Sequence, residues 1–332
     1  MLKKIIYLLC LIIILSGCNN NNNKAPNKNN LKPGKTQKIV EIEFNADSAW
    51  SYINKQVSFG PRVPNSEAHK ACSKYLASYF RNLGAEVIEQ KAQVMAYNRT
   101  MLNITNIIAQ FNPSNKERVI LFAHWDSRPY ADMEEDSTLW NTPIDGANDG
   151  GSGVGVLMEI GRHLAQNPPE IGIDIILFDA EDYGEPDNDE TYYEDPWCLG
   201  SQYWAKNPHK RGYIARYGIL LDMVGAKDAI FAKEGYSQKY AAYLNNKIWK
   251  AAALIGYDNR FSNEETGEII DDHLYLNTIA YIPSIDIIEY NPNSEGYFGP
   301  NWHTLNDNMD IIDRSTLKAV GQTLIQVIYS EK

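Results

Sequence analysis

The sequence predicts an α/β fold: a single domain of three layers, in which helices flank a central, mixed and mostly parallel β-sheet. Short apolar, β-branched runs alternate along the chain with longer segments whose apolar residues recur at helical spacing. The run 119–123 is continuously apolar, which is typical of a central strand buried on both faces. The chain has 332 residues, 44% of them hydrophobic, and can therefore bury a large core.

The N-terminal segment predicts targeting rather than folded structure. Lys3 and Lys4 precede an apolar run, 5–15, that is too short to span a bilayer. The following Leu15-Ser16-Gly17-Cys18 resembles the lipobox of bacterial lipoproteins, so we expect removal of residues 1–17 and lipidation of Cys18. An ordinary signal peptide is the alternative.

A disordered tether over residues 18–44 is expected next, because this part of the chain is rich in Asn, Lys and Pro. Residues 45–332 would then form one catalytic domain held at the bacterial cell envelope, facing the periplasm or the cell surface. Its only membrane contact would be the lipid. The net charge of -11 argues against nucleic acid as the main partner, and the sequence implies no obligate protein partner.

The elements expected in the domain follow from periodicity and capping. Asn65 is the expected N-cap of the second helix, and Gly84 the expected residue after its end. Helices are expected at 47–56, 65–83, 150–165, 201–206, 237–254, 272–278 and 315–329. Strands are expected at 85–95, 104–111, 118–124, 172–179, 214–224 and 281–289.

The strand at 172–179 runs into three acids within four residues, Asp179, Glu181 and Asp182. A solvated acidic turn is the commoner fate of such a cluster. In open α/β sheets, however, chemistry lies beyond the carboxyl ends of the strands. Burying Glu181 beside Asp182 would be costly unless a cation or a shared proton relieves the repulsion.

Other expected strands and loop junctions carry polar groups at the same kind of position. Each has an ordinary structural explanation on its own, such as a core histidine or a helix N-cap. Together they favour a site, and carboxylate plus imidazole without thiolate suits a catalytic zinc ion. The groups are His124-Trp-Asp126, Asp145 to Gly153, Glu181-Asp182, Asp222, Asp271-Asp272-His273 and Trp302-His303.

This ordered set resembles the zinc aminopeptidase superfamily over roughly residues 45–330. Three features are similar to one branch of it, the bacterial, animal-type glutaminyl-peptide cyclotransferases (glutaminyl cyclases). Asp182 replaces the second Glu of the usual pair and is one methylene shorter. Asp271 adds an acid before Asp272-His273, and Trp302 directly precedes His303, with Phe298 before it.

The resemblance implies a zinc-aminopeptidase-like fold and an aminoacyltransferase that binds one zinc ion per chain. It implies that N-terminal Gln of peptides or proteins is cyclised to pyroglutamate with loss of ammonia. The implied zinc ligands are Asp149, Asp182 and His303. Glu181 would be the general base and acid, with Asp222 and Asp271 hydrogen-bonded near it. Trp302, Phe298 and Trp197 would line the substrate pocket.

Two other functions remain open. A dinuclear zinc aminopeptidase would use His124 and Asp222 as further ligands and Glu181 to activate water. A non-catalytic lipoprotein would use the scaffold only to bind peptides or partners. Two structural questions also stay open. Cys72 and Cys198 could form a disulfide or remain free thiols. The acidic loop 184–198 could be a second ion site, a pocket rim carrying Trp197, or a solvated segment.

Overall fold

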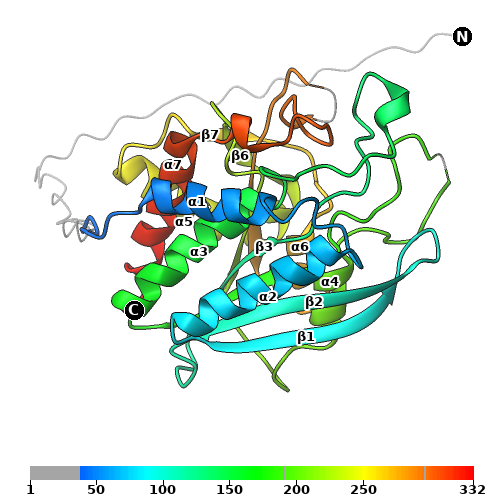
Figure 1. Cartoon of the computed structure of the whole chain (residues 1–332). Helices are drawn as coiled ribbons and strands as arrows, with labels where there is room; N and C mark the ends of the chain where they lie inside the picture. The colour runs from blue at the N-terminus through cyan, green and yellow to red at the C-terminus, as the bar shows by residue number, and fades with distance from the viewer. Residues whose placement is uncertain (1–37, 190, 295–296) are drawn as a thin grey trace, which may run out of the picture. The chain divides into compact units, whose positions relative to one another are not determined.

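The computed structural model describes residues 38–189, 191–294 and 297–332, and Lys38–Lys332 forms one compact unit (Figure 1). The expected signal peptide, Cys18 and most of the expected tether lie outside the described residues. The folded unit starts before the expected boundary at 45, because residues 38–44 pack along the C-terminal helix. There, the backbone N–H groups of Val40 and Phe44 each donate to a Gln side chain at 2.9 Å, and Phe44 is buried.

The main sheet has six strands in the order β1-β2-β4-β3-β5-β8. Strands β4, β3, β5 and β8 run parallel, while β1 and β2 add an antiparallel hairpin at one edge. The mixed, mostly parallel sheet is therefore confirmed. The strand bounds are β1 Glu86–Met95, β2 Met101–Phe111, β3 Arg118–His124, β4 Gly172–Phe178, β5 Gly218–Asp222 and β8 Ser284–Ile288.

Helices cover both faces of this sheet, which makes the three predicted layers. Alternate residues of β4 point to opposite faces: Ile175 and Leu177 join the core under α1, α2, α3, α5 and α7, while Ile176 and Phe178 face α4 and α6. All seven residues of β3 are buried, as expected for a central parallel strand. The bounds are α1 Ala46–Val57, α2 Glu67–Asn82, α3 Gly151–Gln166, α4 Leu199–Lys206, α5 Gly235–Leu254, α6 Asp272–Thr278 and α7 Arg314–Ile328.

Local capping explains where several helices begin. Helix α2 begins one residue later than expected: the N-cap is Ser66, whose side chain accepts from His69 N–H, while Asn65 has a left-handed φ of 74°. Asp271 caps α6 and Asp313 caps α7 through their side chains. Two short 3₁₀ turns, η1 Ser137–Leu139 and η3 Met309–Ile311, lie in loops.

A second, two-stranded sheet was not predicted. It pairs β6 Phe231–Lys233 with β7 Phe261–Glu265, segments too short and too polar to show a strand period. Two expected strands are also shorter than predicted, because the mostly apolar residues 214–217, 223–224 and 281–283 that flank β5 and β8 lie outside the strands.

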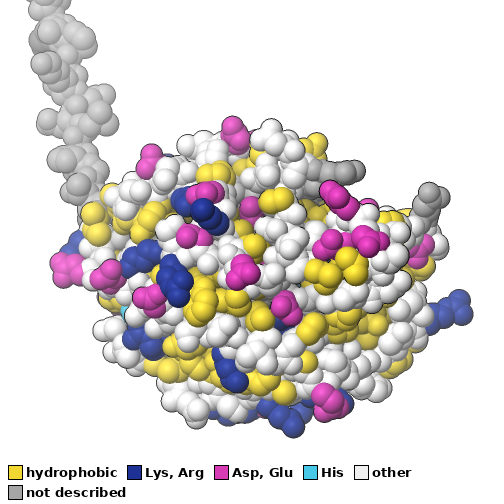
Figure 2. All heavy atoms as spheres, turned by 45° about the horizontal axis from the view of Figure 1, so that its top comes forward, with side chains coloured by type: hydrophobic (Ala, Val, Ile, Leu, Met, Phe, Trp, Pro, Cys, Tyr) yellow, Lys and Arg dark blue, Asp and Glu magenta, His cyan; other side chains and the backbone are white. Residues whose placement is uncertain are grey.

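The surface is charged and mixed. Figure 2 shows acidic and basic side chains interspersed over one face of the molecule. Among the described helices, none combines the length and the apolar character that crossing a bilayer would require.

Candidate active site

The parallel strands bring the predicted strand-end residues to one edge of the sheet. His124 is the last residue of β3 and pairs in register with Phe178, the last of β4. Asp222 is the last residue of β5. Glu181 and Asp182 lie in the loop that begins directly after β4 ends at Phe178. The edge beyond the carboxyl ends is where open α/β sheets place ligands.

Three residues at this edge have a strained backbone. Ala180, Met223 and His303 have positive φ angles of 52°, 48° and 54°, a region that residues other than glycine rarely adopt. Ala180 directly precedes Glu181, and Met223 directly follows Asp222. Such conformations persist where the surrounding packing enforces them, and they cluster at functional sites. Here they turn the chain so that its polar side chains converge.

Two glycines allow the N-terminus of α3 to approach the strand ends. A Cβ on Gly150 would lie 2.4 Å from the carbonyl oxygen of His124, and one on Gly153 would lie 2.2 Å from that of Leu221. Neither position can hold a larger residue without a shift of the backbone. This close approach places Asp149 beside His124, with 3.0 Å between its Oδ1 and His124 Nε2.

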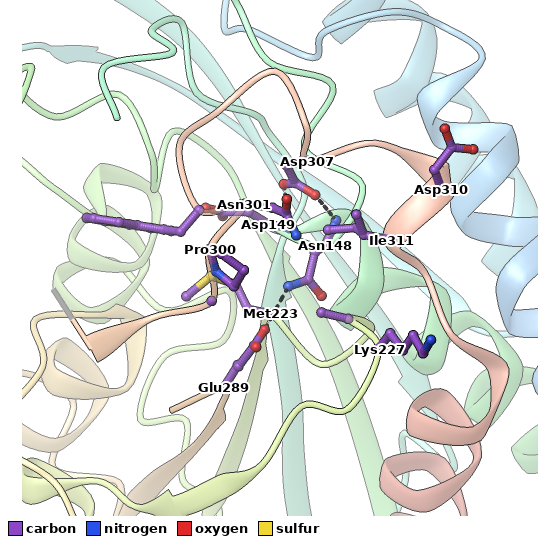
Figure 3. A pocket seen from close by; sticks show the side chains of 13 residues that line it. Asn148, Asp149, Met223, Lys227, Glu289, Pro300, Asn301, Asp307, Asp310 and Ile311 are labelled. Atoms are coloured by element: carbon purple, nitrogen blue, oxygen red, sulfur yellow. Dashed lines mark hydrogen bonds between the residues drawn. The ribbon is translucent and has the colours of Figure 1, made fainter. Parts of the chain in front are cut away.

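A buried acid fixes the loop that carries Asp149. The carboxylate of Asp307 accepts hydrogen bonds from the N–H groups of Asn148 (2.7 Å) and Asp149 (3.1 Å). Figure 3 shows Asp307 above this loop and Glu289 below it, with the Asn148 amide pointing toward Glu289. The cavity in this view has a volume of about 230 Å³. It shares Asp149, Met223 and Trp302 with a neighbouring cavity that is lined by Glu181 and Asp182.

Asp149, Asp182 and His303 form a buried group suited to a metal ion. One ligand atom of each lies within 4.8 Å of the others, and His303 Nε2 is 3.4 Å from Asp182 Oδ1. Asp182 Oδ2 has no hydrogen-bond partner. Burial, and then the charge of Asp149, raise the pKa of Asp182. Two buried carboxylates and one imidazole are ligands typical of zinc. A bound cation would also give the unpartnered oxygen of Asp182 an interaction partner.

Arg128 and Asp132 support these ligands from behind. Arg128 donates to Asp182 Oδ1 at 3.3 Å and forms a buried ion pair with Asp132. Asp132 Oδ1 also lies 3.4 Å from His303 Nδ1, on the side of the ring away from the ligand atom. A carboxylate in this place orients a histidine ligand and raises its basicity.

Glu181 is held separately, next to the metal group. Its backbone N–H donates to Asp126 Oδ1 at 3.1 Å, and the neighbouring N–H of Asp182 donates to Asp126 Oδ2 at 3.3 Å. Its side chain is only partly buried and lines the pocket. Burial raises its pKa well above the ordinary value; the charge of His124 opposes this shift, and the charges of Asp271 and Asp182 add to it. Glu181 can therefore carry a proton near neutral pH.

Asp222 and Asp271 are the acids that flank Glu181. Burial raises the pKa of Asp222 to about 7, although His124 opposes the shift through its hydrogen bond, at 3.2 Å. Burial also raises the pKa of Asp271, against the charge of His273. One oxygen of Asp271 lies within 4.8 Å of Glu181, so these acids titrate as a coupled set.

The structure brings all nine predicted residues of the domain into one cavity of about 280 Å³. The aromatic wall is built as a stack: Trp302 lies on the His303 ring with centroids 3.8 Å apart, and Phe298 packs on Trp302 at 4.7 Å. Trp197 lies parallel to His303 at 6.3 Å. The nine residues are Asp149, Glu181, Asp182, Trp197, Asp222, Asp271, Phe298, Trp302 and His303.

A second group of potential ligands shares Asp149. His124, Asp149 and Asp222 also place one ligand atom each within 4.8 Å of the others. This group is the additional site that a dinuclear enzyme would need. The geometry of the described residues therefore accommodates one metal ion or two.

Sequence reasoning did not identify Arg128, Asp132 or Asp307 as part of the site. Their only sequence signal is position: Arg128 and Asp132 lie just after His124-Trp-Asp126, and Asp307 lies just after His303-Thr304. Each acts through another residue, and spacing along a chain does not reveal such contacts.

The open questions about the thiols and the acidic loop also have structural answers. Cys72 and Cys198 are free and buried. The start of the loop 184–198 is fixed by Arg128 and Asp132, which bond to the backbone of Glu185 (3.0 Å) and Asp187 (2.8 Å). Of the acids of this loop that the structure describes, none belongs to a group of three potential metal ligands.

Comparison with known proteins gives a consistent family. The model of Peptidase family M28 matches residues 106–328. A crystal structure of a Zn-dependent exopeptidase from Parabacteroides distasonis is 55% identical with a TM-score of 0.87, covering 88% of this chain and 100% of that one. A Bacteroides thetaiotaomicron glutaminyl cyclase bound to N-acetylhistamine is 53% identical with a TM-score of 0.86, covering 88% and 99%.

More distant relatives include both an aminopeptidase and a glutaminyl-peptide cyclotransferase. Aminopeptidase YwaD of Bacillus subtilis is 27% identical over 88% of this chain, which spans only 59% of the length of that relative. Glutaminyl-peptide cyclotransferase of Drosophila melanogaster is 23% identical, covering 77% of this chain and 73% of its own length.

Proposed function

The chain belongs to peptidase family M28 and, within it, to the glutaminyl cyclases, and we propose that it cyclises N-terminal Gln of peptides and proteins. The product is an N-terminal pyroglutamyl peptide, and ammonia is released. The observation that carries the proposal is the position of Glu181, which lies between the zinc ligands and two further buried acids in a small aromatic pocket.

Asp149, Asp182 and His303 would hold one zinc ion, which when bound polarises the γ-carboxamide carbonyl of the substrate. Glu181 accepts a proton from the α-amine as the amine nitrogen bonds to the γ-carboxamide carbon. Glu181 then gives that proton to the departing nitrogen, the carbon–nitrogen bond breaks, and ammonia leaves. Glu181 therefore ends the cycle in the protonation state in which it began, and no water is consumed.

Asp222 and Asp271 keep Glu181 competent for both halves of this cycle. The charge of Asp271 raises the pKa of Glu181, and burial raises the pKa of both flanking acids, so this set can hold a proton near neutral pH. Trp302, Phe298 and Trp197 exclude water, which would otherwise compete with the α-amine as nucleophile. A hydrolase would need that water.

A dinuclear aminopeptidase is the second candidate, because the His124, Asp149 and Asp222 group could hold another ion. One experiment tests the cyclase function and separates it from the aminopeptidase function. A soluble domain starting at Lys38 is incubated with a Gln-peptide and with unblocked peptides, and the zinc content of the sample is counted. Ammonia release from the Gln-peptide with one zinc ion per chain is expected. Release of free amino acids with two ions would reject the cyclase function.

We also propose that the protein is a lipoprotein of the bacterial cell envelope. Support comes from the Leu-Ser-Gly-Cys motif ending at Cys18 and from the polar segment after it. Its substrates would then be envelope or secreted proteins whose processing exposes an N-terminal Gln. Metabolic labelling with a fatty-acid analogue tests the anchor: the label is expected in the full-length chain and is lost in Cys18→Ala.

A further inference from the structure

We propose that Cys198 is a positioning residue for the reaction, and that its thiol holds one oxygen of the Glu181 carboxyl group. This inference rests on the proposed function of Glu181 as the proton carrier. Cys198 Sγ donates to Glu181 Oε1 at 3.0 Å. Of the described side chains, that of Cys198 alone makes a hydrogen bond to this carboxyl group. Cys198 itself is completely buried.

The backbone around Cys198 is built to deliver this contact. Its N–H donates to the carbonyl oxygen of Glu181 at 2.9 Å, and the next N–H, of Leu199, donates to that of Ala180 at 3.0 Å. Cys198 and Ala180 both have positive φ angles, 56° and 52°, so two strained residues face each other across this pair of bonds. The start of α4 is thereby fastened to the end of β4.

A third group converges on the same place. Glu181, Cys198 and Asp271 each offer an atom within 4.8 Å of the others, and Asp271 Oδ2 is buried without a hydrogen-bond partner. Asp271 is therefore the neighbouring group toward which an unheld Glu181 carboxyl group would turn. The thiol occupies Oε1 and so leaves Oε2 as the oxygen that meets the substrate.

A thiol suits this task better than a stronger acid would. Burial, followed by the charges of Glu181, Asp272 and Asp271, raises the pKa of Cys198 well above its ordinary value. The S–H group is a weak donor that keeps its proton. It can therefore bond to Oε1 whether Glu181 is charged or neutral, and the transferred proton is taken up and delivered at the same oxygen.

The kinetic test compares Cys198→Ala with Cys198→Ser in the zinc-loaded enzyme. Loss of the donor leaves Glu181 free to turn toward Asp271, so Cys198→Ala is expected to lower kcat by about 10- to 100-fold, as misplacement of a catalytic group does. KM should change little, and Cys198→Ser should restore most of kcat because the hydroxyl again donates. Cys72→Ala is the matched control, since Cys72 is an equally buried free thiol in α2.

A kcat for Cys198→Ala within twofold of the parent would overturn the proposal. Equal losses in the Ala and Ser variants, accompanied by equal falls in Tm, would also overturn it by showing a packing role.

A spectroscopic measurement tests the hydrogen bond without an activity assay. It leaves Cys198 in place, so it does not depend on whether the Cys198 variants fold. The S–H stretching band of Cys198 is recorded in the infrared in a Cys72→Ala background, where it is the remaining thiol of the chain from Lys38 onward. Replacing the acceptor in Glu181→Ala is expected to move the band to higher frequency. An unchanged band would reject the hydrogen bond even if the enzyme is an active cyclase. If the band shifts in Glu181→Ala but the parent protein with Glu181 intact has no cyclase activity, the result would count against the proposed function alone.

Discussion

Two clusters that contain buried acids, one around Asp174 inside β4 and one beyond the carboxyl end of β4, differ in how their charges are satisfied. Within the strand, Asp174 accepts from Gln110 at 2.9 Å, from Arg118 Nε at 2.8 Å and from Tyr213. The other N–H groups of Arg118 donate to this acid and to three backbone carbonyl groups. This Asp174 cluster is a closed set, in which each charge has a partner.

The carboxyl-end cluster, beyond β4, is an open set. Oxygen atoms of Asp182, Asp271, Asp272 and Asp286 are buried without hydrogen-bond partners. Burial raises the pKa values of all four, and the charges of neighbouring carboxyl groups raise those of Asp182, Asp272 and Asp286 further. A buried charge that is fully paired serves structure, whereas unpaired acids at a strand end hold protons and await a cation.

The largest expected effect is on turnover in the open set. Glu181→Gln keeps the shape of the side chain but removes the proton carrier, so kcat should fall by about 10²- to 10⁴-fold. Zinc content and Tm should stay near those of the parent, because Glu181 is outside the Asp149, Asp182 and His303 group. Ammonia release and metal analysis on one sample check both points. Full activity in this variant would remove Glu181 from the mechanism.

Breaking the closed set should instead cost stability. Arg118→Met leaves Asp174 buried and unpaired, which is expected to lower the free energy of unfolding by about 3–5 kcal/mol. The kcat of the folded fraction should be little changed. Urea unfolding measures the loss, and Lys70→Met is the control. Its pair with Glu67 is exposed, so the control should change by less than about 1 kcal/mol. An equal effect of both variants would contradict the comparison.

Asp132, a paired acid behind the zinc ligands, should tune the affinity of the site for zinc. Asp132→Asn weakens the support of His303 and of Arg128, and zinc affinity is expected to fall by about 10- to 100-fold. Competition with a chelator measures the affinity. Asp136→Asn is the matched control, because Asp136 lies nearby in sequence but is exposed and caps η1. Unchanged zinc affinity in Asp132→Asn would show that His303 is oriented by packing alone.

The closed and open sets were not equally visible in the sequence. The order of apolar strands and the acids at their ends predicted the sheet and the residues of the pocket, because parallel strands align their carboxyl ends. The Asp174 cluster was hidden inside an apolar run, where an acid gives no sign of its partner. Arg128, Asp132 and Cys198 were missed for a related reason: they act through contacts between segments distant in sequence.

The pH dependence of stability should have opposite signs in the two regions. In zinc-free protein, Asp222 and Asp307 have folded pKa values of about 7 and about 8, both raised mainly by burial. The folded state binds protons that the unfolded state releases, so their contribution falls as pH rises from about 4 through 8. Zinc favours the ionised ligands and should reduce this alkaline loss.

His209, next to the Asp174 cluster, should act in the other direction. It contacts Gln110 at 3.1 Å, and burial lowers its pKa to about 4. Because the unfolded histidine titrates near pH 6.5, its contribution is present above about 6.5 and is lost as pH falls toward 4. Melting curves from pH 4 to 8, with and without zinc, check both slopes. His209→Gln should remove only the acid-side loss. If it altered the zinc-dependent alkaline slope as well, the two regions would be energetically coupled and the comparison between them would fail.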